Sequence, residues 1–242
     1  MTSDPIFWLL AITGVIITGI SKSGFAGGAG VVAVPLLSFK IGVLEATAIT
    51  LPLLLAMDAQ TLRYYFRQIN WPELRGLIPG ALVGIFLGGF AMGSASDSAL
   101  MLGLGILCIL FALWARLQQA LMRFKGARFF WSTSSGLSST LVHAGGPPIN
   151  IYFVSRALPK AAWLATAGAF FAIMNAIKLI PYSLNGQWSL QLVAISVVLL
   201  PMAYLGVWLG KQIQGRLSET QFMQACRFLL FAVGVSLIWK VV

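Results

Sequence analysis

Charged side chains are scarce in this chain, and acidic ones are the scarcest. Of its 242 residues 9% are charged and 59% are hydrophobic, and only six are Asp or Glu. Soluble domains have about 25% charged residues, so this composition excludes an ordinary soluble domain and indicates a polytopic membrane protein. The net charge of +10 does not indicate nucleic-acid binding, because the Lys and Arg residues are spread over short gaps between apolar runs.

The residues of metal sites and catalytic centres are also rare. The only histidine is His143, which excludes a histidine-rich metal site, and Cys108 and Cys226 fall in apolar runs, where we interpret them as small core residues. The sequence has no carboxylate pair at one site, no Cys-His arrangement, no HExxH motif and no phosphate loop. We therefore expect no metal, no cofactor and no enzymatic activity.

Apolar segments fill the chain, and the gaps between them are too short for a soluble domain. They span residues 6–20, 25–39, 41–62, 77–92, 99–115, 129–154, 161–182, 190–210 and 220–239. A membrane-spanning helix needs about 20 residues, so the first two segments are too short alone, and 77–92 and 99–115 are marginal. Because no Lys or Arg precedes Ile6, the N-terminus is unlike a secretory signal peptide, and we expect it in the mature fold.

Two glycine-rich breaks interrupt the apolar segments, one near the start of each half. They are residues 24–30, Gly-Phe-Ala-Gly-Gly-Ala-Gly, and residues 143–150, His-Ala-Gly-Gly-Pro-Pro-Ile-Asn. Backbone that leaves its helix inside a bilayer must bond to protein or line a water-filled cavity, so paired breaks point to a transport site. Seven Ser and Thr residues between Ser132 and Thr140 precede the second break and suit a cavity wall.

The two halves of the chain also resemble each other. At one constant offset, Gly19, Ser21 and Met57-Asp58-Ala59 match Gly136, Ser138 and Met174-Asn175-Ala176. At a second offset, Pro79, Ala81, Gly84, Leu87 and Gly88 match Pro201, Ala203, Gly206, Leu209 and Gly210. Five matches with Pro, Gly and Leu at identical spacing favour duplication over chance. We expect a first repeat over 1–117, a cytoplasmic linker over 118–128 and a second repeat over 129–242.

Loop charge predicts how these repeats are oriented. The basic residues lie in the loops around 63–75, 116–128, 156–160 and 211–216, whereas the turns 93–97 and 183–189 have none. The positive-inside rule is satisfied if 6–39 and 129–154 each enter the membrane and return to the side they came from. The expected fold is an all-α polytopic membrane protein made of two four-element inverted repeats. Each repeat opens with a glycine-broken re-entrant or discontinuous hairpin, and Lys40, on the outer side, is the exception to the rule.

The breaks suggest an anionic substrate, because helix N-termini present free N–H groups and partial positive charge. The substrate-binding candidates among the glycines are Gly27, Gly28, Gly30, Gly145 and Gly146. The alternative interpretation is that small residues only allow close helix packing. We favour packing for Gly84, Gly88, Gly206 and Gly210, which have less polar and Pro content beside them.

Titratable residues near the breaks are the candidates for proton coupling. His143 could carry a coupling proton, pair with an anion when charged, or bond to the backbone as a neutral residue. Asp58 corresponds to Asn175, and the two are candidates for lining a central cavity, because an intramembrane carboxylate is costly. Asp58 could be a proton site, or it could form an ion pair with the nearby Arg63.

Other polar residues complete the candidate site. Lys22, beside Ser21 and Ser23, could offset substrate charge, and Ser21 and Ser138 are counted among the substrate-binding hydroxyls. Asn150 could donate an amide N–H to an oxyanion or cap the backbone. We expect Lys178 to extend towards the membrane interface, as long basic side chains do.

Taken together, these motifs resemble a known family. Residues 19–37, Gly-Ile-Ser-Lys-Ser-Gly-Phe-Ala-Gly-Gly-Ala-Gly-Val-Val-Ala-Val-Pro-Leu-Leu, the His143-Ala-Gly-Gly-Pro motif and the four-plus-four repeat are similar to the TauE/SafE family of sulfite and organosulfonate exporters. The resemblance covers almost the whole chain. It implies secondary export of sulfite, sulfoacetate or related sulfur oxyanions across the inner membrane, coupled to protons and working by alternating access.

Two other functions fit the same motifs. A passive anion channel would require a continuous pore in place of a closed central site, and a non-transporting membrane subunit would have its breaks plugged by protein. The expected partners are a small sulfur-containing anion, the lipid bilayer and a second copy of the chain in a homodimer, with no nucleic acid.

Overall fold

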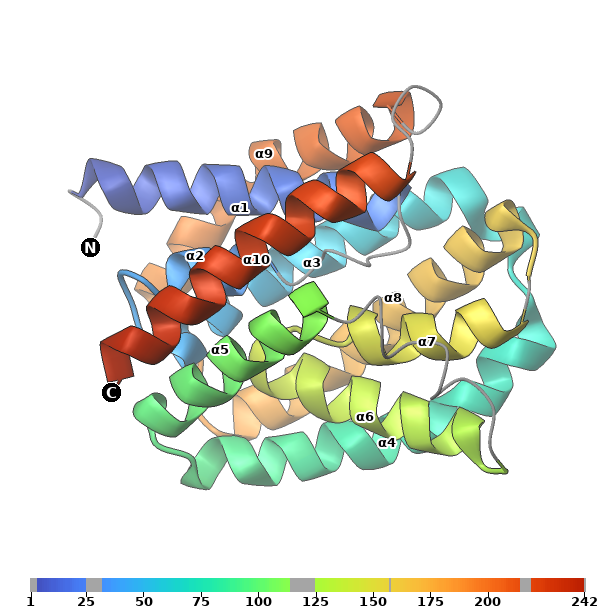
Figure 1. Cartoon of the computed structure of the whole chain (residues 1–242), viewed down its shortest axis with the longest axis horizontal. Coiled ribbons are helices and arrows are strands. Elements are labelled where there is room, and N and C mark those ends of the chain that lie inside the picture. Colours follow the sequence, from blue (N-terminus) through green and yellow to red (C-terminus); the bar gives the residue numbers. More distant parts are fainter. Residues whose placement is uncertain (1–3, 25–31, 114–124, 157, 214–218, 242) are drawn as a thin grey trace.

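The chain folds into helices throughout the part that its computed structural model describes, residues 4–24, 32–113, 125–156, 158–213 and 219–241 (Figure 1). The helices are α1 Pro5–Gly24, α2 Ala33–Leu37, α3 Val43–Tyr65, the 3-10 helix η1 Phe66–Gln68, α4 Trp71–Ser94, α5 Asp97–Leu113, α6 Ala127–Val142, α7 Gly146–Arg156, α8 Lys160–Leu184, α9 Leu190–Ile213 and α10 Glu219–Val241. Within this part, α1, α3 with η1, α4, α8 and α9 are long and apolar enough to cross a membrane. The predicted all-helical membrane protein is thereby confirmed.

Two helices are longer than hydropathy suggested. α1 has 20 residues, so the expectation that segment 6–20 is too short to span is wrong. At the polar end of this helix the Ser23 hydroxyl lies 2.8 Å from the Val207 carbonyl of α9 and 3.2 Å from the Gly19 carbonyl of its own helix. α4 begins at Trp71 rather than near 77, because the Asn70 side chain caps it by accepting a bond of 3.1 Å from the Glu73 N–H.

Two outer helix pairs lie on either side of a central pair, and α5 packs against α10 as a further pair. α1 packs against α9, α6 packs against α4, and α3 lies against α8. In Figure 1 the α1–α9 pair lies above α3 and α8, and the α4–α6 pair lies below them. α3 and α8 therefore contact each other in the interior, where side chains from both halves of the chain meet.

Glycines make the two outer pairs close. A Cβ added at Gly84 of α4 would lie 2.7 Å from the Leu137 backbone nitrogen of α6. One added at Gly206 of α9 would lie 2.7 Å from the Ile16 carbonyl oxygen of α1. Gly88 and Gly210 face Thr140 and Ser23 in the same way. The packing interpretation of these four glycines is confirmed.

Ion pairs hold the two ends of the bundle. At one end, the Lys40 ammonium lies 2.8 Å from Asp4, so the chain after α2 is back beside the start of α1. The hydrogen bond from Lys40 lowers the pKa of the exposed Asp4 carboxyl.

At the other end, the buried Glu73 carboxylate of α4 bonds to Arg128 of α6 and to Tyr152 and Arg156 of α7. Its distance to Arg156 Nε is 3.2 Å. The start of α6 and the end of α7 therefore lie together, so α7 returns along α6. Arg156, one of the basic residues of the loop 156–160, therefore also has a structural bond.

The close helix pairs lead to a stability prediction. Gly84→Ala and Gly206→Ala should each lower the free energy of unfolding by about 1–3 kcal/mol, because the new methyl group meets backbone that a rotamer change cannot move. Gly103→Ala is the matched control in α5, where no other described part of the chain comes within 4 Å of the added Cβ outside the helix's own backbone. It should be neutral or stabilising by up to about 1 kcal/mol. Thermal unfolding in detergent measures all three, and Gly84→Ala unfolding like Gly103→Ala would contradict this packing.

Candidate functional site

The second break begins where α6 ends, at a residue with left-handed backbone. His143 follows Val142 with φ 55° and ψ 25°, a conformation that costs an L-residue roughly 1–2 kcal/mol. The ring offsets this cost with contacts on both nitrogens. Nδ1 lies 2.9 Å from the Ser139 carbonyl oxygen, and Nε2 lies 3.0 Å from the Thr47 carbonyl oxygen of α3. The break is therefore fixed to the helix before it and to the centre of the bundle.

Serine hydroxyls satisfy the backbone that leaves the helix. Ser135 Oγ donates to the Gly145 carbonyl at 2.7 Å, and the Ser138 hydroxyl lies 2.9 Å from the Ala144 carbonyl and 2.7 Å from the Ser134 carbonyl of its own helix. Buried carbonyls need such partners where no water is present. These two serines of the predicted cavity wall thus bond to the break itself. Gly145 allows this arrangement, since a Cβ there would lie 2.8 Å from that of Ser139.

α7 starts at Gly146 with few free donors. Pro147 and Pro148 have no N–H, so the first turn offers an anion fewer backbone bonds than an ordinary helix N-terminus. Asn150, one turn further, is half-buried, and its Oδ1 has no hydrogen-bond partner within the described residues. Side chains therefore supply most of the polar groups around this break.

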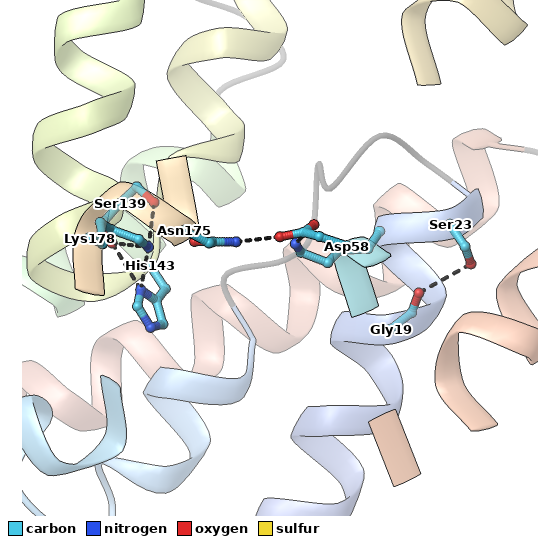
Figure 2. A network of polar contacts seen from close by, with 8 residues as sticks. Gly19, Ser23, Asp58, Ser139, His143, Asn175 and Lys178 are labelled. Atoms are coloured by element: carbon cyan, nitrogen blue, oxygen red, sulfur yellow. Dashed lines mark hydrogen bonds and ion pairs between the residues drawn. The ribbon is translucent and has the colours of Figure 1, made fainter. Parts of the chain in front are cut away.

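A buried ion pair lies where the two halves meet. Lys22 of α1 forms an ion pair with Asp58 of α3, and both side chains are buried. Asn175 of α8 donates to the other Asp58 oxygen at 2.6 Å (Figure 2). Asp58 therefore pairs with Lys22, and the prediction of an ion pair with Arg63 is wrong. Asp58 lies one turn from Arg63 in sequence, but its carboxylate points into the bundle.

A second buried lysine lies beside the break. Lys178 of α8 is 0% exposed, so the expectation that it extends to the membrane interface is wrong. Its Nζ lies 3.0 Å from Ser139 Oγ, 3.1 Å from the Ser139 carbonyl oxygen and 3.0 Å from His143 Nδ1 (Figure 2). Tyr182, one turn later, stacks on the His143 ring with centroids 6.1 Å apart. Within the described part of the chain, no carboxylate forms an ion pair with Lys178.

These groups surround a small pocket between the two halves. It is lined by Lys22, Leu54, Ser139, His143, Gly146, Phe171 and Asn175. A second, mostly apolar pocket between α1, α2 and α3 shares His143 and Leu54 with it. Around the first pocket two lysines face one carboxylate, so the nearby charge is positive on balance when both lysines are protonated. Such an excess in a low-dielectric interior favours a bound anion.

The structure brings together part of the predicted site. Lys22, His143, Gly146 and Asn175 line the pocket, and Asp58 lies directly behind Lys22 and Asn175. The lining does not include Ser21, Ser138, Gly145 or Asn150. Gly27, Gly28 and Gly30 lie outside the described residues.

Sequence reasoning missed Leu54, Phe171 and Lys178, whereas Ser139 belongs to the seven Ser and Thr residues expected to form a cavity wall. A signal for Lys178 was available. It follows Asn175 by three residues, which places both on one face of α8, and a lysine within an apolar segment is expensive unless it faces the interior. Phe171 carried no comparable signal, since aromatic residues are common in such helices.

The Lys22–Asp58 pair generates a prediction about stability. Lys22→Met should lower the free energy of unfolding by about 3–5 kcal/mol, because it leaves a buried carboxylate without its counter-ion. The double variant Lys22→Met/Asp58→Asn should recover most of that loss.

The control for this pair is Lys40→Met. It removes the Lys40–Asp4 pair, whose side chains are each 34% exposed, and should cost at most about 1 kcal/mol. Chemical or thermal unfolding in detergent compares the variants. Equal losses for Lys22→Met and Lys40→Met would show that Asp58 does not depend on Lys22.

Comparisons with known proteins identify the family of the chain. Residues 10–237 match the family described as sulfite exporter TauE/SafE. The chain is also similar to the probable inner membrane transporter protein TsaS of Comamonas testosteroni, with 28% identity over 187 residues, which cover 72% of this chain and 76% of that protein. No solved structure matches the chain significantly. The chain therefore belongs to the sulfite exporter TauE/SafE family and is a multi-pass transporter of the inner membrane.

Proposed function

We propose that this protein is a secondary transporter that exports small sulfur oxyanions, such as sulfite or sulfoacetate, in exchange for or together with protons. The observation that carries the proposal is the pocket between the two halves, where Lys22 and His143 line a space whose surroundings hold two lysines and one carboxylate. The name of the family and of the inner-membrane relative TsaS support the same class of substrate and activity.

The lining suits a small oxyanion. Lys22 and Asn175 can each donate to an anionic oxygen, and Ser139 adds a hydroxyl, whereas both ring nitrogens of His143 already have protein partners. Leu54 and Phe171 exclude water from the remaining wall, which strengthens each of these bonds. Lys22 lines the pocket as a cation, and Asp58 balances its charge. The excess positive charge therefore comes from Lys178.

The architecture we infer for this transporter is a pair of inverted repeats, 1–117 and 129–242, joined by a cytoplasmic linker over 118–128. The helix pairs support this architecture, since a contact within one pair has its equivalent, between the matched residues, in the other pair. Gly19 of α1 meets Gly206 of α9, and their matches Gly136 of α6 and Gly84 of α4 meet each other. The matched Asp58 and Asn175 bond directly. A two-fold relation between the repeats would produce these contacts.

In this arrangement the two hairpins enter the membrane from opposite sides. The first opens at the end where Asp4 pairs with Lys40, and the second opens where Arg128 and Arg156 bond to Glu73. The second end carries the basic loops, so we place it in the cytoplasm. Movement of one repeat against the other would then expose the pocket to one side at a time, as in other inverted-repeat transporters.

Transport by proteoliposomes tests the proposal. Radiolabelled sulfite and sulfoacetate should accumulate when a pH gradient is imposed, and Asn175→Asp should reduce the rate by about 100-fold, because a second carboxylate beside Asp58 repels the anion. Asn70→Asp is the matched control, since Asp caps a helix as well as Asn and this position is remote from the pocket.

Three results would contradict the proposal. Flux that only equilibrates would indicate a channel. No flux of either anion by folded protein would remove the substrate assignment. Equal rates for Asn175→Asp and Asn70→Asp would place the anion elsewhere.

A further inference from the structure

His143, Lys178 and Ser139 form a triangle of polar atoms that does not fix a single arrangement of protons. His143 Nδ1, Lys178 Nζ and the Ser139 carbonyl oxygen lie 2.9–3.1 Å from one another. The carbonyl can only accept hydrogen bonds, whereas each nitrogen can donate or, when unprotonated, accept. Several proton arrangements therefore fit the same atom positions.

The other ring nitrogen of His143 limits which proton arrangements are possible. Nε2 lies 3.0 Å from the Thr47 carbonyl, so it carries a hydrogen in every arrangement. If Nδ1 has no hydrogen, it accepts from the Lys178 ammonium, and the charge is on the lysine. If Nδ1 has one, it donates to the Ser139 carbonyl, and the charge is on the imidazole. Both forms contain the same number of protons and a single positive charge.

A form with one more proton keeps two of these hydrogen bonds, but the ammonium hydrogen that faces Nδ1 then has no acceptor there. Nδ1 would donate to the Ser139 carbonyl, and Lys178 would donate to Ser139 Oγ, which lies 3.0 Å away. Repulsion between two cations 3.0 Å apart also opposes this form. A negative charge in the pocket, which His143 and Ser139 line, would offset that repulsion.

We propose that His143 and Lys178 act as one proton-sharing cation whose charge follows that of the bound substrate. The pair holds one positive charge when the pocket is empty or contains a singly charged anion. It takes one further proton from solution when a doubly charged anion binds, with the imidazole and the ammonium then both protonated. This inference rests on the proposed function and identifies the carrier of the coupling proton.

The other charged groups around His143 already have partners. From α1 and α3, Lys22 and Asp58 are paired with each other, and the Tyr182 hydroxyl of α8 donates to the Thr140 carbonyl at 2.8 Å. On α4, Glu73 is bonded to Arg128 and to Arg156 of α7, near the start of α6.

On α5, Asp97 accepts from the Val43 N–H at 2.8 Å. Among the described residues beside the pocket, the His143–Lys178 pair is thus the one whose hydrogen-bond partners do not fix which atoms carry the protons.

Isothermal titration of purified protein in buffers of different ionisation enthalpy tests this inference, because it counts the protons taken up per bound anion. The two probes are sulfoacetate, with two negative charges, and its isosteric amide, sulfoacetamide, with one. Wild-type protein at neutral pH should take up about one proton more with sulfoacetate than with sulfoacetamide. Equal uptake would overturn the inference without any variant being needed.

Three variants assign the proton. His143→Asn retains a residue that tolerates left-handed backbone, and it should abolish the difference between the two probes. Lys178→Met should make sulfoacetamide binding take up about one proton, since the imidazole must then supply the charge alone. Asp58→Asn also removes the counter-ion of Lys22, so it is compared with His143→Asn: loss of the difference in Asp58→Asn with its retention in His143→Asn would assign the proton to Asp58 instead.

Lys240→Met, remote from the pocket at the end of α10, is the control for losing a lysine and should match wild type. The same experiment separates this inference from the proposed function. Binding of both anions with equal proton uptake would overturn the inference alone, whereas no binding of either anion would overturn the proposed function as well.

Discussion

A fully buried lysine beside a helix break is the constraint on which the central site depends. An ammonium in a low-dielectric interior is costly unless acceptors surround it, and Lys178 finds three acceptor atoms on Ser139 and His143. Those atoms are available because α6 ends there, and carbonyls in the last turn of a helix can accept further bonds. The break and the buried charge therefore stabilise each other.

The close helix pairs hold the hairpins that carry these charges. Glycines bring α1 to α9 and α6 to α4 at backbone distance, so Lys22 and Ser139 approach the middle from opposite sides. The two occupy matched positions in the two halves, as do Asp58 and Asn175. One half thus provides a neutral Lys–Asp pair, and the other provides a cation without a carboxylate. This difference gives the pocket its positive charge.

Sequence patterns predicted the helices, the second break and the packing glycines, because hydropathy, Gly-Pro content and regular spacing are local signals. They did not predict that Asp58 pairs with Lys22, which is distant along the chain, in place of the neighbouring Arg63. They also did not predict which hydroxyls face the pocket. Near a break the direction of each side chain depends on where the helix ends, and this directs Ser138 to the backbone and Ser139 to Lys178.

The central claim is that the pocket beside Lys22, His143 and Asn175 holds the transported oxyanion. An experimental structure with selenite, a heavier analogue of sulfite, tests it most directly, because anomalous scattering locates selenium unambiguously. The prediction is a selenium peak in this pocket, beside the His143 ring and with oxygens within hydrogen-bonding distance of Lys22 and Asn175, and loss of the peak in Lys22→Met/Asp58→Asn. An empty pocket at saturating selenite, or selenium bound only elsewhere, would contradict the claim.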